Sequence, residues 1–194
     1  TFYFRPQNNV VLEAGNRYTY TVKVNATGLT LEGCTIGNWV DGGGESGEAE
    51  DLGYSIQNDG SYTVYNANGL MNVAELVNGG KTDINITLTA DIDLTGKDWT
   101  PIGTDYDNSY TGTFDGGGHT ITGLTVTTND EYAGLFGYLG NFNNGAATVK
   151  NVVMEGIQIT CNHRLGYAGG VAGYSQGTIE NCSVSGSVSG TVYV

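Results

Sequence analysis

Four tyrosines stand at related positions in the second half of the chain and are the residues best suited to hold a ligand. Tyr138 and Tyr174 each follow a short glycine-flanked motif, and Tyr132 and Tyr167 lie a few residues before them. An aromatic ring offers a broad apolar face with a polar edge, which is the kind of surface on which a sugar ring stacks. We expect one of two arrangements: a stripe of rings that contacts glycans, or ordinary surface aromatics of a β-rich protein.

Asp91 and Asp93 are the residues whose spacing comes nearest to catalysis. Two residues apart on a strand, they share one face at roughly 7 Å, and paired carboxylates at such distances act as acid and base in glycoside hydrolysis. Threonines alternate around them, without a basic residue that could neutralise an acidic sugar. We therefore interpret both as solvated carboxylates and predict no catalytic residue.

Two acidic stretches contain oxygen ligands of the kind that calcium prefers. Asp105 and Asp107 stand among tyrosines and asparagine in an expected loop, while residues 41–60 hold a run of carboxylates and glycines. That run lacks the spacing of an EF-hand loop, so a linker is the favoured interpretation there. We predict no metal-binding residue and no cofactor, with calcium at Asp105 and Asp107 as the open alternative.

The motifs of common hydrolases are missing from the sequence. An HExxH zinc-peptidase motif is excluded because His119 and His163 are followed by Thr-Ile and Arg-Leu, and no Gly-x-Ser-x-Gly elbow occurs. The three cysteines, Cys34, Cys161 and Cys182, have no CxxC spacing, which favours buried thiols over a zinc site. The chain is predicted not to be an enzyme.

An acidic, glycine-rich composition narrows the class of partner. The chain of 194 residues has 20 Asp and Glu against 7 Lys and Arg, a formal charge of −13. Nucleic acid is excluded as a partner because phosphate binding needs a basic face, and no apolar run is long enough to insert into a membrane. The 32 glycines with only 2 prolines argue against collagen, and a hydrophobic content of 39% predicts a folded chain.

Three predicted regions position these residues. Residues 1–40 carry short alternating strands, such as 17–24, that are too few to bury a core and are expected to be an incomplete antiparallel β-sandwich. Residues 41–60 are predicted to be an acidic linker. Residues 61–194 are the main folded region and begin with a helix near 68–78, where apolar residues recur at i, i+3, i+4 and i+7.

An internal repeat determines the fold predicted for the main region. Similar segments start at Thr120, Thr148 and Thr178, 28 and 30 residues apart, and each contains a Gly or Asn that tolerates positive φ. Strand, bend and strand at this spacing predict the coils of a parallel β-helix, a solenoid, with the helix as the cap of its first coil. The class is therefore all-β. The predicted columns of stacked side chains are Ile121–Val149–Ile179 and Val126–Met154–Val184, with Asn151 next to Asn181 in an amide ladder.

Short motifs between about residues 62 and 194 resemble the GLUG-motif repeats of bacterial surface proteins. These motifs are Gly-Leu-Phe-Gly at 134–137, Gly-Val-Ala-Gly at 170–173, Trp-Thr-Pro-Ile-Gly at 99–103 and Phe-Asp-Gly-Gly-Gly-His-Thr-Ile at 114–121. Val171 departs from the usual leucine. GLUG repeats occur in large adhesin-like proteins and beside the catalytic domain of IgA1-specific metallopeptidases.

Residues 1–40 are similar to the last strands of fimbrillin-like domains from Bacteroidetes. The segments that carry this resemblance are Glu13 to Val22 and Ile36 to Trp39. They cover only the end of such a domain, so the resemblance implies a partial fimbrillin-like strand region.

Together the two resemblances imply a non-enzymatic bacterial protein, extracellular or on the outer-membrane surface, with an adhesive or fimbria-related structural role. Its partners would be a host or bacterial surface glycan or protein, or other pilus or surface subunits. The glycan-contact residues would be Tyr132, Tyr138, Tyr167 and Tyr174. The alternative is an accessory glycan- or substrate-binding module of a secreted hydrolase or peptidase whose catalytic domain lies outside these residues.

Overall fold

The computed structural model describes the backbone of residues 17–25 and 28–37 and all atoms of residues 51–142, 146–191 and 193–194. The chain divides into two compact units, Thr1–Leu52 and Gly53–Val194. Cys34, Trp39 and residues 41–50 of the predicted linker lie outside the residues whose side chains are described.

The first unit contains a two-stranded antiparallel sheet. Strand β1 (Arg17–Asn25) pairs with β2 (Gly28–Gly37), with Arg17 opposite Gly37 and Asn25 opposite Gly28. Strict alternation of polar and apolar residues in β1 favours this extended pairing. The predicted strands are therefore present, while the sandwich to which they were assigned stays a prediction.

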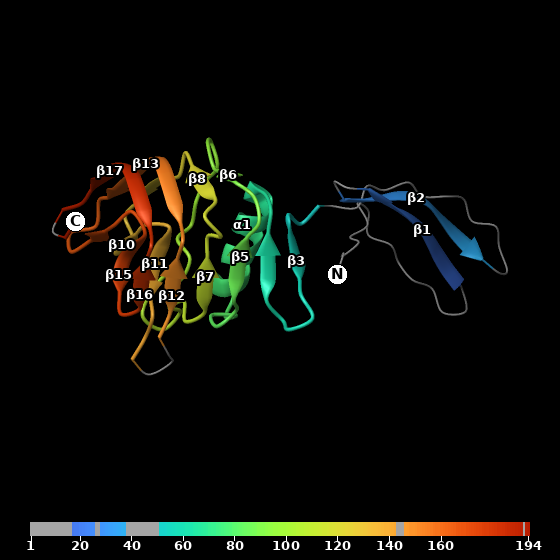
Figure 1. Ribbon diagram of the computed structural model, residues 1–194, viewed down its shortest axis with the longest axis horizontal. Coiled ribbons are helices and arrows are strands. Elements are labelled where there is room, and N and C mark those ends of the chain that lie inside the picture. The colour runs from blue at the N-terminus through green and yellow to red at the C-terminus, as the bar shows by residue number, and fades with distance from the viewer. Residues whose placement is uncertain (1–16, 26–27, 38–50, 143–145, 192) are drawn as a thin grey trace. The chain divides into compact units, whose positions relative to one another are not determined.

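The second unit is mostly β-structure with one helix (Figure 1). Its strands are short because glycine and asparagine bends interrupt the chain every few residues. The elements are β3 (Tyr54–Ile56), β4 (Tyr62–Val64), α1 (Ala67–Asn78), β5 (Ile86–Leu88), β6 (Ile92–Asp93), β7 (Thr113–Asp115), β8 (Thr120–Thr122), β9 (Thr125–Thr128), β10 (Tyr132–Ala133), β11 (Phe136–Leu139), β12 (Thr148–Lys150), β13 (Val153–Cys161), β14 (Tyr167–Ala168), β15 (Ala172–Ser175), β16 (Thr178–Glu180) and β17 (Ser183–Ser189).

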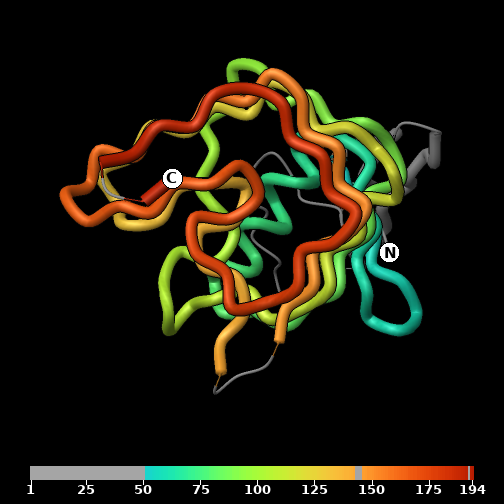
Figure 2. The backbone as a smooth tube through the Cα atoms, turned by 60° about the vertical axis from the view of Figure 1, so that its left-hand side comes forward, coloured from blue at the N-terminus to red at the C-terminus, as the bar shows by residue number. Residues whose placement is uncertain are grey.

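Two larger sheets and two strand pairs run along this unit. The six-stranded sheet has the order β16-β12-β7-β5-β4-β3, and the five-stranded sheet has the order β17-β13-β8-β6, with β9 also paired to β13. The strand pairs are β10-β14 and β11-β15. All pairings in this unit are parallel except that of β3 with β4, so the larger sheet is mixed, and none of the sheets closes on itself. Figure 2 shows the yellow, orange and red segments following one another around a common outline.

Helix α1 confirms the helix predicted near 68–78. The Asn66 side chain caps its start by accepting a hydrogen bond from the Gly69 backbone N–H at 2.9 Å, and Gly79 ends it. Its apolar face is fully buried at Leu70, Val73 and Val77, and the helix packs against β3, β4 and β6. The amphipathic spacing therefore predicted both the helix and the face that it buries.

The end of the predicted linker is wrong, because residues 54–56 form β3. The polar run that follows them is a hairpin turn: the Asp59 carboxylate accepts hydrogen bonds from the backbone N–H and the hydroxyl of Ser61, and Gly60 has a φ of 84°. The turn returns the chain to β4, which pairs with β3. The polar composition of the residues between β3 and β4 is therefore that of a tight turn and not of a flexible linker.

The predicted columns are correct between the last two copies of the repeat. Val149 lies opposite Ile179, and Met154 lies opposite Val184. Asn151 and Asn181 have positive φ values of 54° and 56°, and the Asn181 side-chain amide donates to Asn151 Oδ1 at 2.9 Å, which confirms the amide ladder. Asn151 in turn donates to Asp115 Oδ1 at 3.0 Å.

The predicted register of the first copy is wrong. Phe114, and not Ile121, lies opposite Val149, and Ile121 pairs with Met154 instead. Val126 lies opposite Ile159. The physical reason is the turn at 116–119: Ile121 follows Phe114 by seven residues, whereas Met154 follows Val149 by only five. The strand that begins at Thr120, β8, therefore pairs with β13, which follows the bend at Asn151. Sequence similarity had indicated β12, which precedes that bend.

Candidate functional site

The tyrosines singled out by sequence come from two neighbouring strand pairs. Tyr132 in β10 lies opposite Tyr167 in β14, and Tyr138 in β11 lies opposite Tyr174 in β15. Because both pairs are parallel and in register, equivalent side chains emerge from successive strands at the same place. β10, β11 and β15 lie together at one end of the unit in Figure 1. The fold thus brings all four predicted residues together.

The rings form two stacks that meet edge to face. In one stack, Tyr132 lies 5.5 Å from Tyr167 and Tyr167 lies 4.5 Å from Tyr193 between ring centroids, at interplanar angles of 23° and 8°. In the other, Tyr138 lies 4.7 Å from Tyr174, with the two rings tilted by 34°. Edge contacts of 5.2 Å between Tyr132 and Tyr138 and 5.5 Å between Tyr167 and Tyr174 join the stacks. These separations lie in the range at which aromatic pairs attract each other.

Two members of this arrangement were not predicted. Tyr193 joins the first stack through a parallel bridge to Tyr167, and Tyr106 stands edge-on to Tyr138 at 5.8 Å. Tyr193 follows Tyr167 by 26 residues, whereas Tyr167 follows Tyr132 by 35, so no constant period could have identified it. We call these six residues the tyrosine cluster: Tyr106, Tyr132, Tyr138, Tyr167, Tyr174 and Tyr193.

Exposure within the tyrosine cluster is graded. Tyr138 is only 5% exposed and serves as its floor, whereas Tyr106 and Tyr193 are 40% and 53% exposed. Tyr132, Tyr167 and Tyr174 are half-buried. Much of each ring face is taken up by another tyrosine, so a ligand would meet ring edges at the centre and an open ring at either side.

Burial raises the pKa of three hydroxyl groups of the tyrosine cluster, those of Tyr132, Tyr138 and Tyr167. Burial, a hydrogen bond from Tyr132 to Glu131 Oε1 at 3.1 Å and the Glu131 charge raise the pKa of Tyr132. Burial and neighbouring tyrosines also raise the pKa of Tyr138, whose hydroxyl accepts a hydrogen bond from Gln176 at 3.2 Å. Neutral hydroxyls donate and accept hydrogen bonds but do not transfer protons near neutral pH, which suits binding more than catalysis.

A cavity of about 340 Å³ adjoins the tyrosine cluster at Tyr132. The residues that line it are Thr100, Pro101, Thr104, Asp105, Asp130, Glu131 and Tyr132. It combines one aromatic wall with hydroxyl and carboxylate groups, which are the acceptors that sugar hydroxyls use.

Asp91 and Asp93 each accept hydrogen bonds from neighbouring residues. Asp91 Oδ1 accepts a hydrogen bond from the Thr120 N–H at 3.0 Å and lies 3.3 Å from His119 Nδ1, and these contacts lower the pKa of Asp91. Hydrogen bonds from Thr95 lower the pKa of Asp93. A general acid needs a raised pKa, so neither exposed carboxylate has the shift expected of a general acid, and their interpretation as solvated carboxylates stays a prediction.

The carboxylate of Asp105 organises its own loop. Its Oδ1 atom accepts hydrogen bonds from the backbone N–H groups of Asp107 and Asn108, both at 3.0 Å, and its Oδ2 atom accepts one from the Thr104 hydroxyl. Among the residues with described side chains, no three His, Cys, Asp or Glu side chains are grouped as metal ligands. Calcium at Asp105 and Asp107 stays the alternative prediction.

Comparison with known protein families matches the GLUG motif at residues 165–189. These residues include β14 to β17 and two members of the tyrosine cluster, Tyr167 and Tyr174. The match supports the predicted resemblance at this part of the repeat. The fimbrillin-like resemblance of residues 1–40 stays a prediction.

Two curated relatives share sequence with about half of the chain. Halomucin of Haloquadratum walsbyi is 40% identical over 114 residues, which cover 54% of this chain and 1% of halomucin. A protein named "Putative Gly-rich membrane protein" of Evansella cellulosilytica is 39% identical over 101 residues, which cover 52% of this chain and 11% of that protein. The chain therefore spans only a small part of the length of these relatives.

One solved structure, named as a "putative immunoglobulin A1 protease" from Bacteroides ovatus, is similar in fold to part of this chain. The matched region covers 70% of this chain and 60% of that chain, with a TM-score of 0.44 and 22% sequence identity.

Within the described residues, no helix has the length and apolar character to span a membrane.

Proposed function

We propose that this chain is a non-enzymatic part of a bacterial cell-surface protein, an adhesin or fimbria-related stalk, whose tyrosine cluster contacts surface glycans. The GLUG motif and the relative named as a membrane protein support the surface location. The lowered pKa values of Asp91 and Asp93 do not favour either carboxylate as a general acid, in line with a non-enzymatic role.

The same proposal includes a parallel β-helix for residues 61–194. In-register parallel pairing of strands about 30 residues apart supports it, as in Val149 with Ile179 and Met154 with Val184. Stacked coils would carry the same side chain to the same place on each level, and the tyrosine cluster is the clearest case of this repetition.

The observation that carries the binding proposal is the in-register placement of Tyr132 with Tyr167 and of Tyr138 with Tyr174. Core packing alone does not need six tyrosines at one place, because the buried core of this unit consists mainly of aliphatic side chains. Rings fixed by their neighbours lose little side-chain entropy when a ligand binds. Display of many copies on a cell would add avidity to weak individual contacts.

Glycan-array binding of the full chain tests this proposal. We expect binding above background, and we expect the double variant Tyr174→Ala with Tyr193→Ala to weaken it about tenfold, because an aromatic contact contributes about 0.5–1.5 kcal/mol. The double variant Tyr174→Phe with Tyr193→Phe should retain most of the binding, since the rings remain. Phe142→Ala is the matched control, because Phe142 is 86% exposed and has no part in the tyrosine cluster.

Absence of binding on the array would contradict the proposal. Equal loss of binding in the Phe142→Ala control would also contradict it, because the effect would then not depend on the tyrosine cluster. Circular dichroism of each variant separates loss of a contact from loss of folding.

A further inference from the structure

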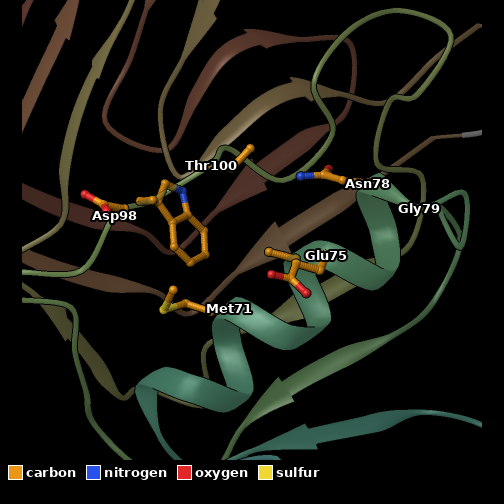
Figure 3. Close-up of a pocket in the computed structure, with 8 residues that line it drawn as sticks. Met71, Glu75, Asn78, Gly79, Asp98 and Thr100 are labelled. Carbon is orange, nitrogen blue, oxygen red and sulfur yellow. The ribbon is translucent and has the colours of Figure 1, made fainter.

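A second cavity of about 340 Å³ lies between α1 and the segment at residues 98–100. Figure 3 shows Met71 and Glu75 on α1, with Asn78 at the end of the helix and Thr100 on the facing segment. The lining residues are Met71, Ala74, Glu75, Asn78, Gly79, Asp98, Trp99 and Thr100. We call this cavity the helix pocket. It shares Thr100 with the cavity beside Tyr132 but contains no member of the tyrosine cluster.

The floor of the helix pocket is apolar and fixed. Trp99 is 8% exposed, and its indole N–H donates to the Leu135 carbonyl oxygen at 3.2 Å. Ala74 is 4% exposed, and the flexible Met71 side chain packs against the core beside it. Because the Trp99 ring is almost completely covered, it cannot offer an open face to a sugar. The floor suits the aliphatic part of a side chain.

The frame of the helix pocket is rigid. Asn78 uses both ends of its side-chain amide, donating to the Pro101 carbonyl oxygen at 3.0 Å and accepting from the Gly103 N–H at 2.8 Å. Its own carbonyl oxygen accepts a hydrogen bond from the Asn108 side chain. These contacts fix the end of α1 to residues 101–108, which directly follow the facing segment, so the cavity is formed before any ligand arrives.

The rim of the helix pocket is negative. Glu75 and Asp98 are exposed, and neither belongs to the two ion pairs recorded among the described side chains. The C-terminal end of α1 adds the negative end of the helix dipole, and the last turn of α1 has no basic residue. Lys81 and Lys97 lie nearby in sequence, but neither lines the pocket.

From this geometry we propose that the helix pocket binds a lysine or arginine side chain of a partner polypeptide. The aliphatic stem would lie on Met71, Ala74 and the edge of Trp99, and the cationic end would lie near Glu75 at the rim. Complementary charge identifies the partner, because the rim has two unpaired carboxylates and the chain carries a formal charge of −13. This interaction is with protein and is independent of the glycan contacts of the tyrosine cluster.

Tryptophan fluorescence of the full chain provides the test. The chain has two tryptophans, so Trp39→Phe leaves Trp99 as the only one. We would titrate this variant with a Gly-Ser peptide carrying one lysine, and with the same peptide carrying norleucine, which has the same aliphatic stem without the charge. We expect a saturable change with the lysine peptide and binding that is several-fold weaker with the norleucine peptide.

Substitutions then locate the binding. Glu75→Gln should weaken lysine-peptide binding about two- to five-fold, in the range of one exposed ion pair. The matched control Glu180→Gln removes the same charge from an exposed position outside the pocket and should have no such effect. Thr100→Lys, at an exposed lining position, should compete from within the chain and abolish binding.

Equal affinity for the two peptides, or the absence of a saturable signal, would overturn the proposal. The same conclusion would follow if Glu180→Gln weakened binding as much as Glu75→Gln, because the effect would then reflect overall charge. None of these outcomes bears on glycan binding by the tyrosine cluster.

Discussion

The second unit buries its apolar residues completely beside α1 and only partly at β16 and β17. Leu70, Val73 and Val77 of the helix are 0% exposed, whereas Ile179 and Val184 are 42% and 41% exposed. Yet Ile179 and Val184 alternate with polar residues as buried strand residues do. The difference shows that a repeat pattern specifies where an apolar side chain points, while a covering neighbour decides how much stability it contributes.

The register of the parallel strands allows two apolar residues at equivalent positions to be compared. Val149 is 0% exposed and its partner Ile179 is 42% exposed, although both occupy the same position in similar Thr-initiated strands. Ile121, in a third such strand, is 0% exposed. Isoleucines in similar local sequences therefore allow the effect of the neighbour to be measured directly.

The largest expected difference is between Ile121→Ala and Ile179→Ala. Ile121→Ala should lower the free energy of unfolding by about 2–5 kcal/mol, because it leaves a cavity in a fully buried site. Ile179→Ala should lower it by about 1 kcal/mol or less, since much of its side chain already contacts water. Urea denaturation at one pH measures both, and equal losses would show that the two positions do not differ in burial.

Two bend glycines provide the next comparison. Gly123 and Gly156 have φ values of 68° and 63°, so an alanine at either position should cost about 1–2 kcal/mol in backbone strain. A Cβ atom at Gly123 would also lie 3.0 Å from the Thr95 backbone, whereas one at Gly156 would meet nothing within 4 Å. Gly123→Ala should therefore reduce the thermal midpoint more than Gly156→Ala, and the reverse order would contradict the packing at this bend.

The amide ladder predicts a smaller difference. The Asn151 side chain donates a hydrogen bond to Asp115 and accepts one from Asn181. The Asn181 side chain has only the bond to Asn151 in the ladder. Asn151→Gly keeps the positive φ and loses both bonds, so it should destabilise the fold by about 1 kcal/mol, and Asn181→Gly by less. Chemical denaturation measures the free energy of unfolding of the two variants. Equal losses in the two would show that the ladder contributes nothing.

The smallest expected effect is a pH dependence at Asp115. Burial opposes its ionisation, but hydrogen bonds from Asn151 and Gly117 and the Lys150 ammonium at 3.4 Å outweigh burial and lower the pKa of Asp115. Its stabilising contribution is therefore present above the ordinary carboxyl pKa of about 4 and is lost as the pH falls through the lower folded value.

Asp115→Asn should reduce the acid-induced loss of stability between pH 5 and pH 2. Thermal melts over this range measure the slope for the variant and the unmodified chain. Asp93→Asn is a useful second variant, because the pKa of Asp93 is lowered by contacts with Thr95 outside the ladder. An unchanged slope in Asp115→Asn would contradict the assignment.

Sequence patterns predicted the elements better than their alignment. Periodicity identified α1 and its buried face, and the Asn151–Asn181 pair followed from equal spacing in the last two copies. The first copy was misaligned because the turn at 116–119 lengthens one bend, and local similarity does not reveal on which side of a bend a strand pairs. β3 was missed because a strand of three residues joined to a polar turn resembles a linker.

The sequence predicted only part of the candidate site, and the reason is related to the misaligned repeat. Tyr138 and Tyr174 occupy equivalent repeat positions, and the structure places them in register. Tyr106 and Tyr193 come from segments without that equivalence, so only the folded arrangement brings them to the tyrosine cluster. The helix pocket could not be predicted either, because α1 and residues 98–103 are joined by contacts that no repeat specifies.

Ring-selective NMR of the tyrosine-labelled chain distinguishes glycan binding at the tyrosine cluster from binding elsewhere on the chain. During titration with the best glycan from the array, we expect shifts of the exposed rings Tyr106 and Tyr193 and of the half-buried Tyr174, with no change at the fully buried Tyr110. Shifts confined to tyrosines outside the cluster, such as Tyr54, would contradict binding at the tyrosine cluster.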